Sequence, residues 1–257
     1  MRVTVCELPN DAGMFRPAWK KLAEHVRAES SDLVLLPELP FHPWPFVRRA
    51  FDRTEWNGLV SAHEEWILKL KELAPATVLG TRQTDVGGRR LNQAFVWTRS
   101  VGVKPAHSKH YLPDEDGFWE ASWYGRGDNR FLPVKVGAAK IGFLICSEMW
   151  SMPEAVSYGR AGVHMIATPR ATGRGSVEKW LMGGRACAVV SGAFSISSNR
   201  NSELSESASL GGQGWIVEPD GRVLGTTSRD HPFLTVDLDL AVATRAKRTY
   251  PRYSIFK

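Results

Sequence analysis

Residues 139–146 read Ala139-Lys140-Ile141-Gly142-Phe143-Leu144-Ile145-Cys146, and the next four are Ser147-Glu148-Met149-Trp150. The apolar run predicts a buried strand with Cys146 at its C-terminal tip. In open α/β sheets, ligands bind outside the carboxyl ends of the strands. A thiol at such a tip faces a crevice while its backbone stays fixed. Cys146 is therefore the first candidate for a functional residue.

Two further residues occupy comparable positions. Glu38 follows the apolar run 32–36, and Lys109 ends the predicted strand 101–108. A thiol nucleophile needs a group that moves protons and activates water, and a carboxylate suits both tasks. It also needs a cation that stabilises a developing oxyanion, and a lysine in that role lowers the pKa of the thiol as well. Together, Glu38, Lys109 and Cys146 favour nucleophilic catalysis by the cysteine. Cys6 and Cys187 lie in apolar contexts and are expected to be core residues.

The rest of the chain alternates between strands and helices. Apolar spacing predicts helices at 16–29, 58–73, 153–161 and 178–190, with a helical tail from 241. It predicts strands at 3–8, 32–36, 77–84, 91–98, 101–108, 134–136, 139–146, 163–168, 193–198, 214–218, 223–225 and 233–237. The segment 109–129 is predicted to be a long irregular loop. Many of these strands lack an intervening helix, which favours an α/β fold of two face-to-face sheets covered outside by helices.

Composition limits the classes of function. The 257 residues carry no composition shift or linker, so one domain over 1–257 is expected. The net charge of +6 is scattered rather than gathered on one arm, which argues against a nucleic-acid partner. Three cysteines give no disulfide framework, and no apolar run suits a leader or a membrane span. A cytoplasmic protein without a membrane partner is expected.

Three ordered motifs carry a family resemblance. They are Leu35-Leu36-Pro37-Glu38, then Ser108-Lys109-His110-Tyr111-Leu112-Pro113, then Gly142-Phe143-Leu144-Ile145-Cys146 with Met152-Pro153-Glu154. The chain resembles the nitrilase superfamily of carbon–nitrogen hydrolases along nearly its whole length. The resemblance implies a four-layer α-β-β-α sandwich that forms a homodimer or a higher homo-oligomer, with no cofactor.

The resemblance also implies roles for individual residues. Glu38 would be the general base and acid, Lys109 the oxyanion stabiliser and Cys146 the nucleophile, and the backbone N–H of Ser147 would be a second oxyanion donor. Members of the family often carry another glutamate in the loop after the lysine, which corresponds to Glu120 here and would position substrate or assist proton transfer.

The substrate is less closely defined by the sequence. Many relatives carry an arginine just after the nucleophile that grips a substrate carboxylate, whereas this chain has Met149 and Trp150 there. Arg170 or Arg174 is a possible replacement. Loop aromatics predict a partly apolar pocket, for which we name Trp44, Trp119 and Trp150 together with Arg170.

The expected reaction is hydrolysis of a small amide or carbamoyl compound through a thioester. A nitrilase acting on a nitrile is the alternative, and a non-catalytic binding member of the fold is a third reading. No spacing of His, Cys and carboxylate residues predicts a metal site.

Overall fold

The computed structural model describes residues 1–203 and 209–257, which include strands in two halves. In the first half the strand order is β5-β4-β3-β2-β1-β12. These strands are β1 (Arg2–Pro9), β2 (Leu33–Leu35), β3 (Thr77–Val86), β4 (Arg89–Thr98), β5 (Gly102–Ser108) and β12 (Phe233–Asp237). In the second half the order is β6-β7-β8-β9-β10-β11. These are β6 (Val134–Val136), β7 (Ala139–Phe143), β8 (Met165–Arg170), β9 (Phe194–Asn201), β10 (Trp215–Val217) and β11 (Val223–Thr226).

The two halves are joined by one short strand pairing and otherwise pack face to face. The end of β1, Glu7–Pro9, pairs in parallel with Asn199–Asn201 of β9. Between the halves lies a core to which both contribute. Its buried members include Val3, Val5, Leu35 and Leu79 from the first half and Ile141, Phe143, Ala167 and Ile196 from the second. Successive side chains of a strand point to opposite faces, so this core uses one face of each sheet.

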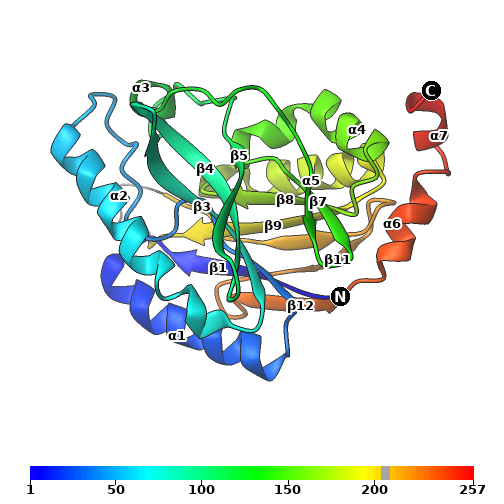
Figure 1. Cartoon of the computed structure of the whole chain (residues 1–257), viewed down its shortest axis with the longest axis horizontal. Helices are drawn as coiled ribbons and strands as arrows, with labels where there is room; N and C mark the ends of the chain where they lie inside the picture. The colour runs from blue at the N-terminus through cyan, green and yellow to red at the C-terminus, as the bar shows by residue number, and fades with distance from the viewer. Residues whose placement is uncertain (204–208) are drawn as a thin grey trace.

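Helices cover the two outer faces (Figure 1). On the first half lie α1 (Ala12–Ala28) and α2 (Arg53–Ile67), and α1 contributes a stripe of Phe15, Trp19, Leu22 and Val26. On the second half lie α4 (Met152–Arg160) and α5 (Val177–Ser191). The predicted four-layer α-β-β-α sandwich is therefore confirmed. The remaining helices are short: α3 (Glu120–Trp123), α6 (Leu240–Ala246), α7 (Arg252–Ile255) and the 3-10 turns η1 (Leu70–Leu73), η2 (Cys146–Trp150) and η3 (Arg174–Ser176).

Several predicted boundaries differ from the observed ones, and two of the differences are informative. The helix predicted over 58–73 begins earlier, because the Asp52 side chain accepts a hydrogen bond from the backbone N–H of Glu55 and caps α2. The strand predicted to end at Cys146 stops at Phe143. The backbone N–H of Ile145 bonds to the carboxylate of Glu148, 2.9 Å away, and Cys146 has φ of +48°. A strand cannot continue through a left-handed residue, so the chain turns before the thiol.

Within the part of the chain that the structure describes, we find no helix with the length and apolar character needed to cross a bilayer.

Candidate active site

Each half of the sandwich delivers part of one site. Glu38 lies three residues beyond β2, and Lys109 directly follows β5, both in the first half. Cys146 comes from the second half, as the first residue of η2. Glu120 opens the short helix α3 within the loop after Lys109. All four side chains are buried, and Cys146 retains 4% of its exposure.

Lys109 lies between two carboxylates. Its Nζ is 2.8 Å from Oε1 of Glu38 and 2.8 Å from each carboxylate oxygen of Glu120. Hydrogen bonds between charged groups are stronger than neutral ones, and three of them hold the ammonium in place. The backbone on either side is fixed too, since the Lys109 N–H donates to Asn92 and the Lys109 carbonyl accepts from Gly127. The position of the charge is therefore well defined.

Asn92 is a member of the site that we did not name from the sequence. Its Nδ2 donates to Oε1 of Glu38 over 2.8 Å. Asn92 lies on β4, on the same face as Ala94 and Val96, which belong to the core between the sheets. A buried amide at an inward position of an apolar strand was the available signal. With Oε1 of Glu38 taken by Asn92 and Lys109, Oε2 of Glu38 has no hydrogen-bond partner among the described residues.

Charge and burial compete at these groups. Burial disfavours the charged form of Lys109, but Glu120 and Glu38 outweigh burial and keep the lysine pKa above its ordinary value. At Glu120, burial prevails over the neighbouring positive charge. Burial and the charge of Glu38 raise the Glu120 pKa to about 7, although Lys109 acts to lower it. The surroundings therefore favour the charged form of Lys109 and shift the titration of Glu120 toward neutral pH.

The surroundings of Cys146 favour the protonated form of its thiol. Burial raises its pKa well above the usual value, and the charges of Glu38 and Glu120 add to the rise. Lys109 and a backbone hydrogen bond from Ala171 act in the opposite direction without prevailing. Lys109 does act to lower the thiol pKa, as expected, but the net shift of that pKa is upward. A thiol of this kind needs a neighbouring base at the moment of attack.

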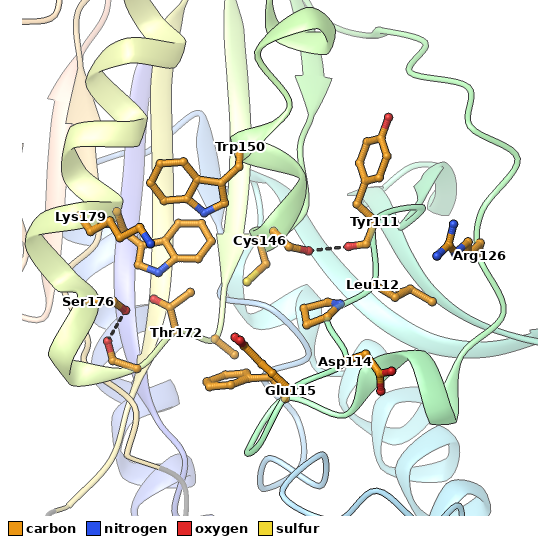
Figure 2. Close-up of a pocket in the computed structure, with 16 residues that line it drawn as sticks. Tyr111, Leu112, Asp114, Glu115, Arg126, Cys146, Trp150, Thr172, Ser176 and Lys179 are labelled. Atoms are coloured by element: carbon orange, nitrogen blue, oxygen red, sulfur yellow. Dashed lines mark hydrogen bonds between the residues drawn. The ribbon is translucent and has the colours of Figure 1, made fainter.

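Cys146 lines a cavity of about 520 Å³. Figure 2 shows Trp150, Ser176 and Lys179 on one side of the thiol, and Tyr111 and Leu112 on the other. The lining combines aromatic and aliphatic walls with a few hydroxyl and charged groups, a composition typical of sites for small molecules. Ser147 also lines the cavity, and its Oγ donates to the Tyr111 carbonyl over 2.5 Å.

The pocket predicted from the sequence needs correction, because only Trp150 of the four named residues lines this cavity. Trp44 is buried, and its Nε1 donates to the Gly117 carbonyl. Trp119 packs under the guanidinium of Arg49.

Arg170 is also absent from the lining of the cavity. It is fully buried, with its guanidinium 4.0 Å from the ring centre of Trp215 and bonded to Ser197 and Thr172. Alternation along β8 explains this burial. Arg170 shares the face of Ile166, which packs toward the outer helices, while Met165 and Ala167 face the other sheet. Residues 1–203 and 209–257 contain no cluster of three or more His, Cys, Asp or Glu side chains suited to a metal ion.

Comparison with known proteins gives the class of this molecule. The sequence model of the carbon-nitrogen hydrolase family matches residues 2–248. The chain therefore belongs to the carbon-nitrogen hydrolase family.

Individual relatives are distant. The glutamine-dependent NAD(+) synthetase of Thermotoga maritima is 26% identical over 273 residues, covering 100% of this chain and 45% of the relative. The chloroplastic omega-amidase of Arabidopsis thaliana is 22% identical over 245 residues, covering 90% of this chain and 65% of the relative. The chain thus spans about half to two thirds of their length. The crystal structure of a carbon-nitrogen hydrolase from Helicobacter pylori G27 superimposes with a TM-score of 0.85 at 20% identity, covering 99% of this chain and 94% of that one.

Proposed function

We propose that this chain hydrolyses the carbon–nitrogen bond of a small amide or carbamoyl compound through a thioester on Cys146, and that it releases ammonia. One observation carries the proposal. Oε2 of Glu38 is a buried carboxylate oxygen without a hydrogen-bond partner among the described residues, and Oε1 of the same side chain bonds to the Lys109 ammonium. The charges of Glu38 and Lys109 both act on the thiol of Cys146, which lines the cavity. Membership of the carbon-nitrogen hydrolase family supports the same class of reaction.

In the first half-reaction, Sγ of Cys146 attacks the carbonyl carbon while Glu38 takes the thiol proton. The carbonyl oxygen becomes an oxyanion, which Lys109 and the backbone N–H of Ser147 stabilise. That N–H belongs to the first turn of η2, where helical N–H groups lack intrahelical partners. Glu38 then donates its proton to the leaving nitrogen, the carbon–nitrogen bond breaks, and ammonia leaves.

In the second half-reaction, water adds to the thioester. Glu38 takes a proton from water, the hydroxide oxygen bonds to the acyl carbon, and a second oxyanion forms at the same place. Its collapse breaks the carbon–sulfur bond and returns the proton to Sγ. Glu120 positions Lys109 by accepting hydrogen bonds from its ammonium group.

The test is a comparison of short amides and carbamoyl compounds with nitriles of the same carbon chain, measured by ammonia release and by intact mass. We expect ammonia from the amide or carbamoyl member and an acyl mass shift on Cys146, both absent in Cys146→Ala. Ammonia from the nitriles alone would replace the proposal by a nitrilase reaction. A panel that gives neither ammonia nor a mass shift would overturn the hydrolase proposal.

A further inference from the structure

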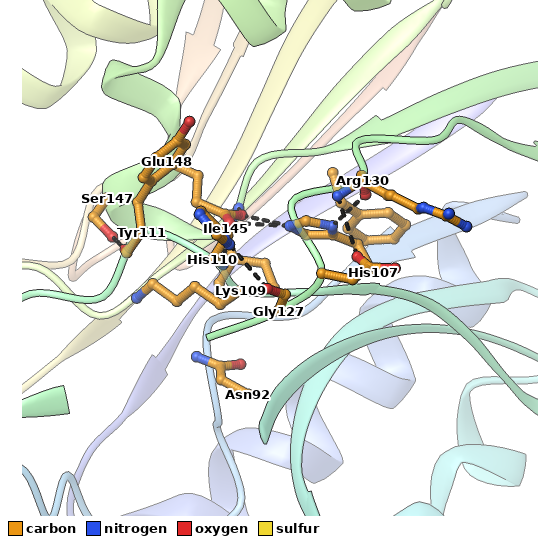
Figure 3. Close-up of polar contacts among 12 residues, drawn as sticks. Asn92, His107, Lys109, His110, Tyr111, Gly127, Arg130, Ile145, Ser147 and Glu148 are labelled. Carbon is orange, nitrogen blue, oxygen red and sulfur yellow. Dashed lines mark hydrogen bonds and ion pairs between the residues drawn. The ribbon is translucent and has the colours of Figure 1, made fainter. Parts of the chain in front are cut away.

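One buried carboxylate ties together the two chain segments that carry Lys109 and Cys146. The Glu148 side chain has no exposed surface. Its Oε1 accepts from the backbone N–H of His110 over 2.6 Å, and its Oε2 accepts from the backbone N–H of Ile145 over 2.9 Å. His110 directly follows Lys109, and Ile145 directly precedes Cys146. Figure 3 shows Glu148 between the two segments.

This bridge exceeds what a local cap requires. Glu148 does cap η2, since it bonds to the N–H of Ile145. A cap needs only that donor. The bond to His110 connects η2 with a segment 38 residues away, which follows β5 of the other sheet. The two hydrogen bonds of Glu148 therefore link the two halves of the sandwich, one of which carries Lys109 and the other Cys146.

A histidine balances the charge of this carboxylate. Nε2 of His107 lies 3.0 and 2.9 Å from the two oxygens of Glu148, and Nδ1 lies 3.2 Å from the Arg130 carbonyl. Both ring nitrogens face oxygen acceptors, an arrangement that favours the doubly protonated imidazolium. Although burial opposes this charge, bonding to Glu148 raises the His107 pKa. Asp128 and Tyr158 are the other titratable groups coupled to this pair.

We propose that Glu148, neutralised by the imidazolium of His107, is a positioning residue that sets the placement of the Lys109 ammonium relative to the Cys146 thiol. The proposal rests on the proposed function, in which these two groups act on the same carbonyl. Burying an ion pair is a poor source of stability, and such pairs are better explained where they specify one arrangement. Here the pair specifies how the segment of Lys109 and His110 lies against the segment of Ile145 and Cys146.

The experiment replaces Glu148 by glutamine, which keeps the size of the side chain and removes its charge. Iodoacetamide alkylation of Cys146 is followed by peptide mass from pH 6 up to the most alkaline pH at which the protein stays folded, because the thiol pKa lies well above its usual value. Lys109 lowers the thiol pKa, so a displaced Lys109 raises the pH midpoint of alkylation. We expect a rate about tenfold lower at pH 8 in Glu148→Gln, because the thiolate fraction sets the rate. An unchanged midpoint and rate in the folded variant would overturn the proposal.

Turnover gives a second readout. A misplacement of about 1 Å in a catalytic group can cost on the order of 100-fold in rate. We expect kcat to fall by about that factor in Glu148→Gln while KM stays within about threefold, because Glu148 is not among the residues that line the cavity. Glu154→Gln, the same change six residues further along, is the matched control and should leave both readouts unaltered. A loss confined to KM would count against positioning.

A second variant covers the case in which Glu148→Gln does not fold. His107→Gln keeps a hydrogen-bond donor toward Glu148 and removes the positive charge. The same upward shift in the alkylation midpoint supports the proposal, and an unshifted midpoint overturns it. Alkylation needs no substrate, so it tests the positioning role even if no amide is hydrolysed. Failure of the proposed function and failure of this inference are thereby distinguished.

Discussion

Gly127 lies against the backbone of Ser108, so that a Cβ on Gly127 would sit 1.9 Å from the Ser108 carbonyl oxygen. Ser108 is the residue before Lys109, and the Gly127 N–H bonds to the Lys109 carbonyl over 2.8 Å. The loop that carries Glu120 thus returns to the strand end that carries Lys109, at a contact only glycine permits.

The first prediction follows from this contact. Gly127→Ala should force the loop away from Lys109, because the obstructing atom is backbone and cannot rotate aside. We expect a loss of about 1–3 kcal/mol in the free energy of unfolding, as for other overpacked sites, and a fall in amide turnover. Urea unfolding and ammonia release measure the two effects. Gly125→Ala, whose new Cβ would have no contact nearer than 3.7 Å, is the control. Equal effects of the two substitutions would contradict the explanation.

The second prediction concerns the proposed base. Glu38→Gln keeps the shape of the side chain but cannot take the proton of a neutral Cys146 thiol. General acid–base groups contribute about 10²–10⁴-fold, and we expect kcat/KM to fall within that range. Circular dichroism should report an unchanged fold. Turnover close to that of the unsubstituted protein would remove Glu38 from the mechanism.

A third prediction uses the pH dependence of stability. The Glu120 pKa is raised from 4.5 to about 7 by burial. A carboxyl whose pKa is raised on folding contributes stability that is complete below the unfolded pKa and is lost as pH rises through the folded value. The free energy of unfolding of the unsubstituted protein, relative to Glu120→Gln, should therefore decrease from about pH 4.5 to about pH 7.

Urea titrations at fixed pH values measure this difference. Glu24→Gln, on the exposed side of α1, serves as a control and should show no such slope. A difference that stays constant, or that increases with pH, would show that the Glu120 pKa is not raised on folding.

The fourth prediction separates the three cysteines. Burial raises the thiol pKa of Cys6, Cys146 and Cys187 alike, to about 12 for Cys187. Cys146 lines the 520 Å³ cavity, whereas the side chains of Cys6 and Cys187 have no exposed surface. In the native protein we expect iodoacetamide to modify Cys146 first, and the other two only on unfolding. Peptide mapping over a time course measures the order. Simultaneous modification of all three in folded protein would refute the assignment of the reactive thiol.

Local patterns in the sequence predicted much of the architecture and less of the site. The strands at 134–136 and 233–237 were confirmed with their boundaries, because each alternates or runs apolar between clear turns. Glu38 and Lys109, which belong to the ordered motifs, lie in contact with each other, and Glu120, which was named from the family resemblance, contacts Lys109 as well. The turn before Cys146 was not predictable, because it depends on a side chain three residues ahead capturing a backbone N–H.

Residues whose roles depend on long-range partners were also missed. Asn92 and Glu38 are 54 residues apart, and nothing local to either reveals their hydrogen bond. Arg170 shows the opposite failure. Its charge suggested contact with substrate, but the alternation of β8 directs the side chain away from the inter-sheet core and toward Trp215. The direction of the Arg170 side chain depends on which face of β8 is turned toward the other sheet. The packing of the two halves sets that orientation.

The division of the site between the two sheets has a consequence for how the protein matures. A chain in which only one sheet has formed contains all the groups proposed for the reaction. Its thiol and its ammonium remain apart, because the two sheets have not yet packed against each other. Such an intermediate has no assembled centre with which to attack bystander amides. Recovery of hydrolysis during refolding should therefore coincide with the docking of the halves and lag behind the formation of either one. Under the proposed function, recovered hydrolysis would mark the completion of assembly.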